Sequence, residues 1–329
     1  MSNDDLSAAL SRVLAEALGQ TRQQMGAQSA SSGTVTDLHR LSGGASRETW
    51  QFMFDGRPLI LQRQRSGDIR DMGVEVAVVR AAHAGGVPVP EVIAASSDPA
   101  ALGASYMVLS HVEGETIARK ILRDAEFSEA RTHLATDCAQ ALARLHAIEA
   151  TTVPTLPAVD QVEQYRTVLD GFGAPHPTFE LAFRWLEANR PPESRRCIVH
   201  GDFRLGNLMV GADGLRAVLD WELAHIGDPM EDLGWLCVKA WRFGSPLPVA
   251  GVGDYESFLS HYSEAAGLSV DEDIVRWWEV LGTLKWGIMC IMQTQSHLNG
   301  MTRSHELAAI GRRVCENEHD LFLALEGRW

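Results

Sequence analysis

The order in which strand-like and helix-like segments follow one another constrains the fold of this 329-residue chain most strongly. Between residues 34 and 110, short β-prone runs alternate with glycine-rich turns, and one helical stretch, MGVEVAVVRAAHAGG, interrupts them. After residue 115, apolar residues recur mainly at the spacing of amphipathic helices. The pattern therefore predicts an α+β fold, with a small β-rich lobe followed by a larger, mostly α-helical lobe.

The same periodicities suggest where the parts begin and end. Leu6, Leu10 and Leu14 recur at helical spacing, so we expect a helical arm over residues 1–30, with the helix itself at about 4–26. An N-terminal lobe is expected over 31–112. Its strands are TVTDLHRL, ETWQFMF and PLILQRQ in a meander, then EVIAAS and SYMVLSHV, which ends at a hinge. The helical lobe is expected over 113–329.

Composition and charge restrict the class of partner. The net charge of −14 disfavours nucleic acid and anionic membranes, which require a concentrated basic face. The acidic N-terminus lacks the basic region of a signal peptide, and no apolar run reaches the length of a bilayer span, so we expect a cytoplasmic protein. The five cysteines lie far apart without a C-x-x-C pair, and we interpret them as core thiols.

The segment VHGDFRLGN, residues 199–207, carries the strongest indication of chemistry. It follows the strand-like run RCIV, and it places Asp202 and Asn207 five residues apart. Protein kinases have the same interval between the aspartate and the asparagine of their catalytic loop. Asp220 ends the next strand-like run, LRAVLD. Each residue alone is an ordinary turn former, but the set matches phosphoryl transfer, which needs a carboxylate base and oxygen ligands for Mg²⁺.

The stretches HGDFRLGNLMV and LDWELAHIGDPMEDLGWL resemble the aminoglycoside phosphotransferase superfamily, whose members share the protein-kinase-like fold. The resemblance extends over roughly residues 34–325. It implies an ATP- and Mg²⁺-dependent transfer to a hydroxyl group of a small molecule. In that assignment Asp202 is the catalytic base, His200 supports the loop, and Asn207 and Asp220 hold Mg²⁺. Asp228, in GDPMED, is expected to cap a helix and to support the active-site loops.

The resemblance also implies a nucleotide site in the N-terminal lobe. Gly43 and Gly44 would let backbone amides approach the phosphates, and Ser46 would add a hydroxyl group. The backbone near Leu109 to His111 would meet adenine at the hinge, with Met107 or Leu109 lining its pocket; the same apolar residues could equally be strand core.

The third strand departs from the family pattern. LILQRQR has no lysine, and Gln62 stands where relatives often have a basic residue. We therefore expect Arg63 to bind the phosphates and to pair with Glu75 on the next helix, with Arg65 as a second candidate.

The acceptor site is expected on the C-terminal helices. Its candidate residues are Trp277, Lys285, Trp286 and His297, although tryptophans at helical spacing are also typical of a core. LSGGASRETWQF and VLDWELAHIGDP are similar to the branch of the superfamily that is associated with acyl-CoA dehydrogenases. The acceptor stays open between a hydroxyacyl-CoA-like metabolite and an aminoglycoside-like compound, with the first preferred.

Two other functions compete with this interpretation. A non-catalytic nucleotide-binding or regulatory module would explain the missing lysine. A metal-dependent phosphohydrolase could use His200, Asp202, Asp220 and His225, although two-metal sites usually gather more ligands. The choice between ATP and GTP and the oligomeric state do not follow from the sequence.

Overall fold

The computed structural model of this protein describes residues 2–24, 33–41, 47–65, 70–192 and 195–328. The chain divides into two compact units. The first unit comprises Met1–Glu113 and Arg216–Glu222, and the second comprises Gly114–Leu215 and Leu223–Trp329. Each unit has its own buried apolar core, and each is described separately below.

The first unit is built on an antiparallel sheet. Its strands are β1 (Val35–Arg40), β2 (Arg47–Phe54), β3 (Arg57–Gln64), β4 (Val92–Ser96) and β5 (Tyr106–Ser110). They lie in the order β1-β2-β3-β5-β4, so the predicted meander of the first three strands is confirmed. The turn from β2 to β3 passes through Asp55 and Gly56, both with positive φ, as tight hairpins require.

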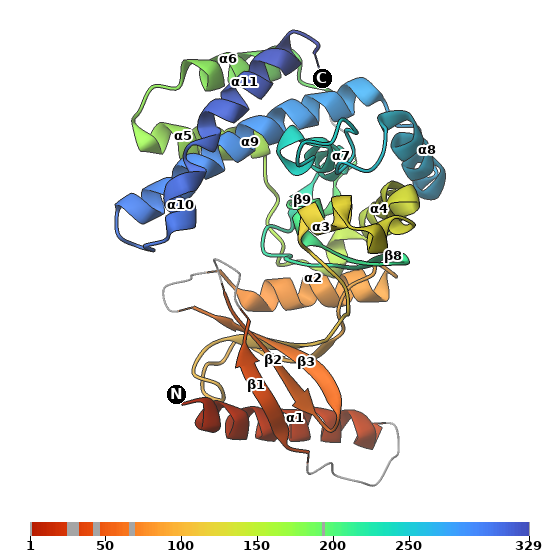
Figure 1. The fold of residues 1–329 in the computed structure, drawn as a ribbon, viewed down its shortest axis with the longest axis vertical. Coiled ribbons are helices and arrows are strands. Elements are labelled where there is room, and N and C mark those ends of the chain that lie inside the picture. Colours follow the sequence, from red (N-terminus) through yellow and green to blue (C-terminus); the bar gives the residue numbers. More distant parts are fainter. Residues whose placement is uncertain (1, 25–32, 42–46, 66–69, 193–194, 329) are drawn as a thin grey trace. The chain divides into compact units, whose positions relative to one another are not determined.

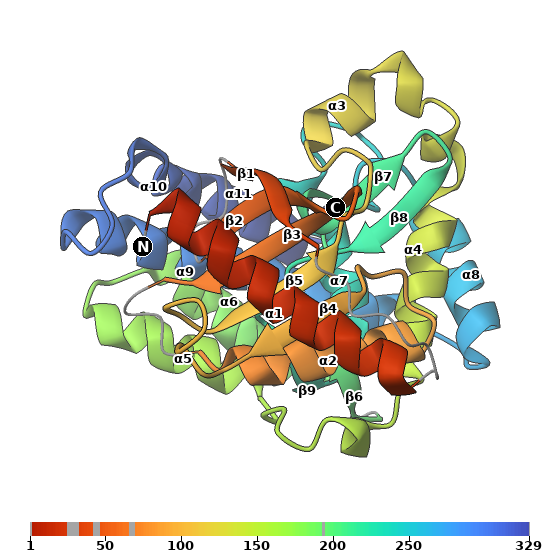
Figure 2. The same ribbon diagram turned by 90° about the horizontal axis from the view of Figure 1, so that it is seen from below.

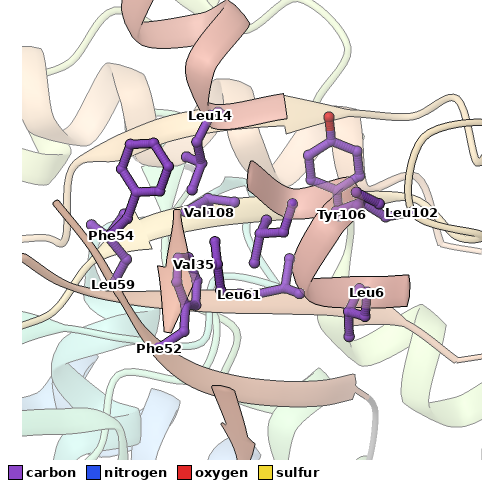
Figure 3. Packing of buried hydrophobic residues seen from close by; sticks show 13 residues of the cluster. Leu6, Leu14, Val35, Phe52, Phe54, Leu59, Leu61, Leu102, Tyr106 and Val108 are labelled. Carbon is purple, nitrogen blue, oxygen red and sulfur yellow. The ribbon is translucent and has the colours of Figure 1, made fainter. Parts of the chain in front are cut away.

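Helices cover both faces of this sheet (Figures 1 and 2). On one face lies α1 (Asn3–Gln24), which confirms the predicted N-terminal helix over its described residues. Leu6, Leu10 and Leu14 are 0–1% exposed and pack against strand residues that include Phe52 and Leu61 (Figure 3). This burial supplies much of the unit's hydrophobic stabilisation, at roughly 1.5–3 kcal/mol for each such side chain.

The opposite face of the sheet is covered by α2 (Met72–Ala84). Met72 and Val76 form a separate cluster there with Met107 and Leu109, and Ile60 packs against it. Because successive strand residues point to opposite faces, the even-numbered residues of β3 face α2 and the odd-numbered ones face α1. This alternation decides which basic residue can reach α2.

The second unit is mostly helical, as the sequence predicted. Its helices are α3 (Ala118–Arg123), α4 (Ala130–His146), α5 (Gln161–Phe172), α6 (Pro177–Ala188), α7 (Met230–Cys237), α8 (Tyr255–Ala266), α9 (Glu272–Leu298), α10 (His305–Ile310) and α11 (Arg313–Leu325). Short strands β6 (Cys197–Val199) and β9 (His225–Gly227) pair antiparallel within it. The strands β7 (Leu208–Gly211) and β8 (Gly214–Val218) follow residues 200–207, the candidate catalytic loop, and the boundary between the units falls inside β8.

Close packing of α7 on α9 organises the core next to the catalytic loop. A Cβ atom at Gly234 would lie 2.6 Å from the Cβ of Trp278 and 2.8 Å from the backbone nitrogen of Glu279, so only glycine fits there. Around this contact, Trp235, Trp241 and Trp286 form an aromatic cluster.

Two expectations about the whole sequence can be compared with the structure. Cys138, Cys197, Cys237 and Cys290 are buried, as predicted, but Cys315 is exposed because it lies on the outer side of α11. Among the described residues, helices that combine the length and apolarity of a bilayer span are absent.

Candidate active site

The loop that follows β6 begins with a conformation that only glycine adopts easily. Gly201 has φ of 76°, and a Cβ atom there would lie 2.5 Å from the carbonyl oxygen of Leu223. The position that protein kinases fill with arginine must therefore be glycine in this chain. The turn directs the chain from the strand to Asp202.

Asp232 of α7 holds this loop by its backbone. Its carboxylate accepts hydrogen bonds from the amides of His200 (2.8 Å) and Gly201 (2.9 Å), and His146 Nε2 lies 3.1 Å away. Burial of the fully enclosed Asp232 opposes its charge, but the hydrogen bonds and the neighbouring histidines outweigh burial and lower its pKa.

Asp228 and Asp232, which stand in the same segment, have different partners. Asp228 Oδ1 accepts a hydrogen bond from the amide of Met230 at 2.8 Å, which is the predicted cap of α7. The carboxylate that binds the loop amides is that of Asp232, one helical turn further along, where it points from α7 toward β6. Its partners lie more than 30 residues away in the chain, so the sequence carried no local signal for them.

Three donors orient the carboxylate of Asp202. Oδ1 accepts from Trp235 Nε1 at 2.9 Å and from Arg204 Nε at 3.1 Å, and Oδ2 accepts from Asn207 Nδ2 at 2.6 Å. Arg204 itself lies over the ring of Trp241. Asp202 is 8% exposed, so the side chain is held in place while one part of it can still meet a ligand.

His200 lies inside the loop and not at its surface. It is fully buried, its Nδ1 accepts a hydrogen bond from the amide of Asp202 at 3.1 Å, and its ring packs edge-on against Phe203. These contacts suit a residue that shapes the loop. They do not present the imidazole to a ligand.

Asn207 and Asp220 carry the oxygen atoms that the sequence assigns to Mg²⁺. The amide nitrogen of Asn207 donates both to the backbone oxygen and to the carboxylate of Asp202, which leaves its amide oxygen as the atom able to ligate a cation. Amide and carboxylate oxygens are the donors that Mg²⁺ prefers. Within the described residues, histidine, cysteine and acidic side chains form no cluster of three or more that could hold a metal.

Asp220 belongs to the first unit and has an unusual backbone conformation. Its φ is 66°, in the left-handed region that costs a non-glycine residue energy and that is often found at functional sites. The segment around it is fixed within that unit: Arg70 Nη1 lies 2.7 Å from Glu222 Oε2, and the amide of Val218 donates to Pro88. Trp221, next to it, is buried and donates its indole N–H to the carbonyl of Val218.

Lys285 of α9 is bound to the same loop from the other side. Its Nζ donates to the carbonyl oxygen of Gly201 at 2.8 Å, lies 3.5 Å from Glu231 and stacks on the ring of Trp235. Burial alone would lower the pKa of Lys285, but Tyr165, Glu231 and other nearby acids outweigh it and raise the pKa. The buried ammonium group therefore has partners both in the loop and on α7.

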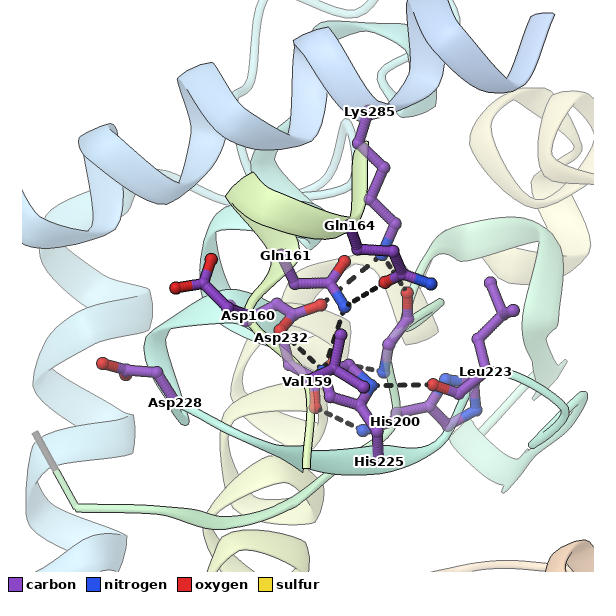
Figure 4. A network of polar contacts seen from close by, with 12 residues as sticks. Val159, Asp160, Gln161, Gln164, His200, Leu223, His225, Asp228, Asp232 and Lys285 are labelled. Atoms are coloured by element: carbon purple, nitrogen blue, oxygen red, sulfur yellow. Dashed lines mark hydrogen bonds and ion pairs between the residues drawn. The ribbon is translucent and has the colours of Figure 1, made fainter. Parts of the chain in front are cut away.

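His225 extends this network from β9 (Figure 4). Its Nε2 lies 3.0 Å from Glu231 Oε2 and 3.2 Å from Gln161 Nε2, and its Nδ1 donates to the carbonyl of Leu223 at 2.9 Å. Burial lowers the pKa of His225, but the charge and hydrogen bond of Glu231, together with the hydrogen bond to Leu223, outweigh burial and raise it. Strand β9, α7 and α9 are thereby joined beneath the catalytic loop.

The prediction that Arg63 pairs with Glu75 is wrong, because a different arginine forms this ion pair. The carboxylate of Glu75, on α2, is paired with Arg47 from β2, and both residues are buried. Arg63 is an odd-numbered residue of β3 and faces away from α2, whereas Gln62 faces it. Burial raises the pKa of Glu75, while the charge of Arg47 and its hydrogen bond act in the opposite direction.

The structure describes only some of the remaining candidates for the nucleotide site. Gly43, Gly44 and Ser46 lie outside the described residues. Leu109 and Met107 are both buried against α2, so the strand-core alternative describes their side chains. The amide of His111 donates to the carbonyl of Pro58 at 3.4 Å.

The four acceptor-site candidates do not come together. Trp277 and His297 lie at positions of α9 that a helix separates by about 30 Å. Trp277 donates its indole N–H to the carbonyl of Leu186, Trp286 packs against Trp241, and His297 accepts from the amide of Ser304. A single small ligand therefore cannot contact all four residues.

A cavity of about 500 Å³ lies in the second unit beside the N-terminal half of α9. Trp277 and Trp278 line it together with charged residues of both signs, among them Arg196 and Asp228. Gln161 lines this cavity and also contacts His225, so the cavity borders the network beneath the loop. The mixed charge of its walls does not select between a polycationic and an anionic ligand.

The sequence did not indicate several residues that build this site: Arg47, His146, Arg204, Glu231, Asp232 and Trp235. All of them except His146 stand within the stretches that carry the family resemblance, and this is the one signal that could have drawn attention to them.

Two curated proteins are similar to this chain over part of their length. Acyl-CoA dehydrogenase family member 10 of Mus musculus is 29% identical over 230 residues, covering 65% of this chain and 21% of that protein. Acyl-CoA dehydrogenase family member 11 of Homo sapiens is 26% identical over 296 residues, covering 79% of this chain and 36% of that protein. The matched region thus spans a fifth to about a third of the length of these relatives.

Solved structures and a family profile show the fold and the family. A Ralstonia eutropha protein assigned as an aminoglycoside phosphotransferase superimposes with a TM-score of 0.74 at 20% identity, covering 95% of this chain and 98% of that one. A ternary complex of an aminoglycoside phosphotransferase with AMP-PNP and hygromycin B gives 0.60 at 17% identity, covering 88% and 94%. The profile of the phosphotransferase enzyme family matches residues 37–278. This chain belongs to the phosphotransferase enzyme family.

Proposed function

We propose that this protein transfers the γ-phosphoryl group of ATP to a hydroxyl group of a small molecule, with Asp202 as the catalytic base. The observation that carries the proposal is the set of three donors on the Asp202 carboxylate, in a loop whose amides are fixed by Asp232. A base that is positioned before the acceptor arrives loses little entropy during the reaction. The complex of one solved neighbour with the ATP analogue AMP-PNP supports ATP as the co-substrate.

In the proposed reaction, the oxygen of the acceptor hydroxyl forms a bond to the γ-phosphorus while Asp202 accepts the hydroxyl proton. The bond between the γ-phosphorus and the bridging oxygen breaks, and ADP leaves with that oxygen. The amide oxygen of Asn207 and the carboxylate of Asp220 would hold Mg²⁺, which neutralises charge on the phosphates. Trp235 and Arg204 share Oδ1 of Asp202, so Oδ2 is the atom that the acceptor proton would reach, beside Asn207.

Replacing Asp202 by asparagine tests this role. Asp202→Asn preserves the size of the side chain but removes the base, so phosphoryl transfer should fall by about a hundredfold to ten-thousandfold while MgADP binding is retained. Asp254→Asn is the matched control, because Asp254 caps α8 and asparagine caps helices equally well. Unchanged transfer by Asp202→Asn would contradict the proposal.

For the acceptor we propose a hydroxyacyl-CoA-like metabolite before an aminoglycoside-like compound. The support is the similarity to acyl-CoA dehydrogenase family members, which are larger proteins that this chain matches over part of their length. A thermal-unfolding screen in MgADP, with hydroxyacyl-CoAs, aminoglycosides and simple alcohols, would identify the class, because a ligand that binds the folded state raises Tm. A protein that binds MgADP but phosphorylates no compound of such a panel would favour a regulatory module instead.

A further inference from the structure

The cation that meets Glu75 comes from a different strand than the family pattern leads one to expect. Arg47 is the first residue of β2, it is 7% exposed, and its Nη2 is hydrogen-bonded to Glu75 Oε2. Glu75 is 6% exposed. A buried carboxylate of this kind requires a charged partner, and here β2 supplies it.

The strand register explains how β2 can take over this role. Thr49 lies opposite Gln62 and Arg47 lies opposite Gln64, so the side chain of Arg47 is a diagonal neighbour of Gln62 on the surface that faces α2. Arg47 Nη1 lies 3.5 Å from Gln62 Oε1. Gln62 therefore occupies the third-strand position that faces Glu75, and the charge that its amide lacks is delivered from the adjacent strand.

The guanidinium group of Arg47 has more donors than its described partners use. It carries five N–H bonds, of which Glu75 and Gln62 accept from the two terminal nitrogens. Nε is buried and has no acceptor among the residues that the structure describes. A buried donor without an acceptor is destabilising, and an acceptor oxygen of an anionic ligand would relieve this.

The surroundings of the pair within the first unit fit a phosphate-binding role. Arg47 directly follows the segment SGGAS in the chain. Arg70, just before α2, holds Glu222 and with it the segment that contains Asp220. The residues proposed to bind phosphate and metal in this unit therefore lie on connected elements.

We propose that Arg47 binds the α- and β-phosphates of the nucleotide in place of a third-strand lysine, and that Glu75 orients its guanidinium group. The inference rests on the proposed function. An arginine remains charged at any working pH and presents its donors in a fixed plane, which suits two phosphate oxygens at once. On this proposal, the cation has moved from β3 to β2, so the missing lysine in β3 does not indicate a loss of enzyme activity.

Calorimetric titration of the full chain with MgADP and, separately, with adenosine tests the relocation. Arg47→Gln should weaken MgADP binding by about tenfold to a hundredfold, the loss of hydrogen bonds to a charged group. Adenosine affinity should stay within twofold, since adenosine has no phosphate. Arg40→Gln is the matched control: Arg40 is an exposed arginine of the neighbouring strand β1, and it pairs with Glu48.

Moving the charge back to β3 provides the decisive variant. Gln62→Lys added to Arg47→Gln returns a cation to Glu75 from the expected strand and should restore most of the MgADP affinity. Because Arg47→Gln alone leaves a buried carboxylate unpaired, Arg47→Gln with Glu75→Gln is measured beside it, and thermal unfolding confirms that each variant is folded.

The outcomes separate the inference from the function on which it rests. If wild-type protein binds MgADP and Arg47→Gln binds it equally well, the inference is overturned and the proposed function stands. Equal losses of adenosine and MgADP affinity would make Arg47 a structural residue, and a loss confined to Arg63→Gln would return the role to β3; both overturn the inference. A wild-type protein that does not bind MgADP would overturn the proposed function itself.

Discussion

At the scale of single residues, the candidate base is defined by what donates to it. Trp235 Nε1 is one of two donors to Asp202 Oδ1, at 2.9 Å, and it comes from a helix outside the loop. The bond fixes the orientation of the carboxylate, because the indole N–H can only donate and the carboxylate oxygen accepts. Trp235 is therefore a positioning residue for the proposed base.

Removing that donor should impair turnover more than nucleotide binding. Trp235→Phe keeps an aromatic ring but loses the N–H group, and we expect kcat to fall by about tenfold with an unchanged Kd for MgADP. Trp50→Phe is the control, since Trp50 packs against the core of the first unit and its Nε1 has no acceptor among the described residues. Equal kcat values in the two variants would contradict the role of Trp235; steady-state kinetics and calorimetry measure both quantities.

At the scale of elements, the periodic patterns predicted most of the fold. The strands of the meander, α1, α2 and the apolar face of α4 follow directly from apolar spacing, and all are confirmed. The pairing of Arg47 with Glu75 could not be predicted, because it depends on the register between β2 and β3. LILQ has three consecutive apolar residues, so its pattern does not show which side chains point to which face of the sheet. The sequence therefore could not show whether Gln62 or Arg63 faces α2.

The same limit applies to the support of the catalytic loop. The roles of Asp202 and Asn207 rest on a five-residue spacing that the sequence displays directly. Asp232, by contrast, joins His146 and the amide of His200, which lie 86 and 32 residues away, and only the packing of α4, β6 and α7 brings them together. Local sequence patterns describe elements, whereas these contacts arise between elements.

The contact between β9 and α7 should make stability depend on pH. The folded-state pKa of His225 is raised above its unfolded value of about 6.5, mainly because Glu231 outweighs the effects of burial and of Lys285. Its stabilising contribution is therefore fully present below pH ~6.5 and is lost as the pH rises through the folded-state pKa. Removing the imidazole should remove this part of the pH dependence.

Denaturant unfolding of wild-type protein and His225→Gln between pH 5.5 and 9, at intervals of about half a unit, measures this contribution. The difference in free energy of unfolding should be largest at the acidic end and should shrink as the pH rises. A difference that stays constant over the range would show that His225 does not change protonation with folding. Gln is the chosen replacement because its amide can still donate to the carbonyl of Leu223.

At the scale of the whole molecule, each of the two units has its own main apolar cluster, and among the described residues these two clusters share no side chain. In the first, Leu10 is fully buried between α1 and the sheet; in the second, Leu281 is 1% exposed between α9 and its neighbouring helices. Separate cores allow the units to open with different free energies, since local unfolding follows the contacts within each cooperative part.

Matched core truncations should therefore act within their own unit. Leu10→Ala and Leu281→Ala each remove the same buried atoms and should cost about 2–5 kcal/mol. Hydrogen exchange of backbone amides under native conditions should show faster exchange over β1 to β5 for Leu10→Ala, and over α5, α6 and α9 for Leu281→Ala, with little change in the other unit.

MgADP at a hundred times its Kd should slow exchange by an amount equivalent to about 2.7 kcal/mol wherever opening releases the nucleotide. If both variants raised exchange equally along the whole chain, the two cores would unfold as one cooperative structure, and stabilisation by nucleotide would extend to every element.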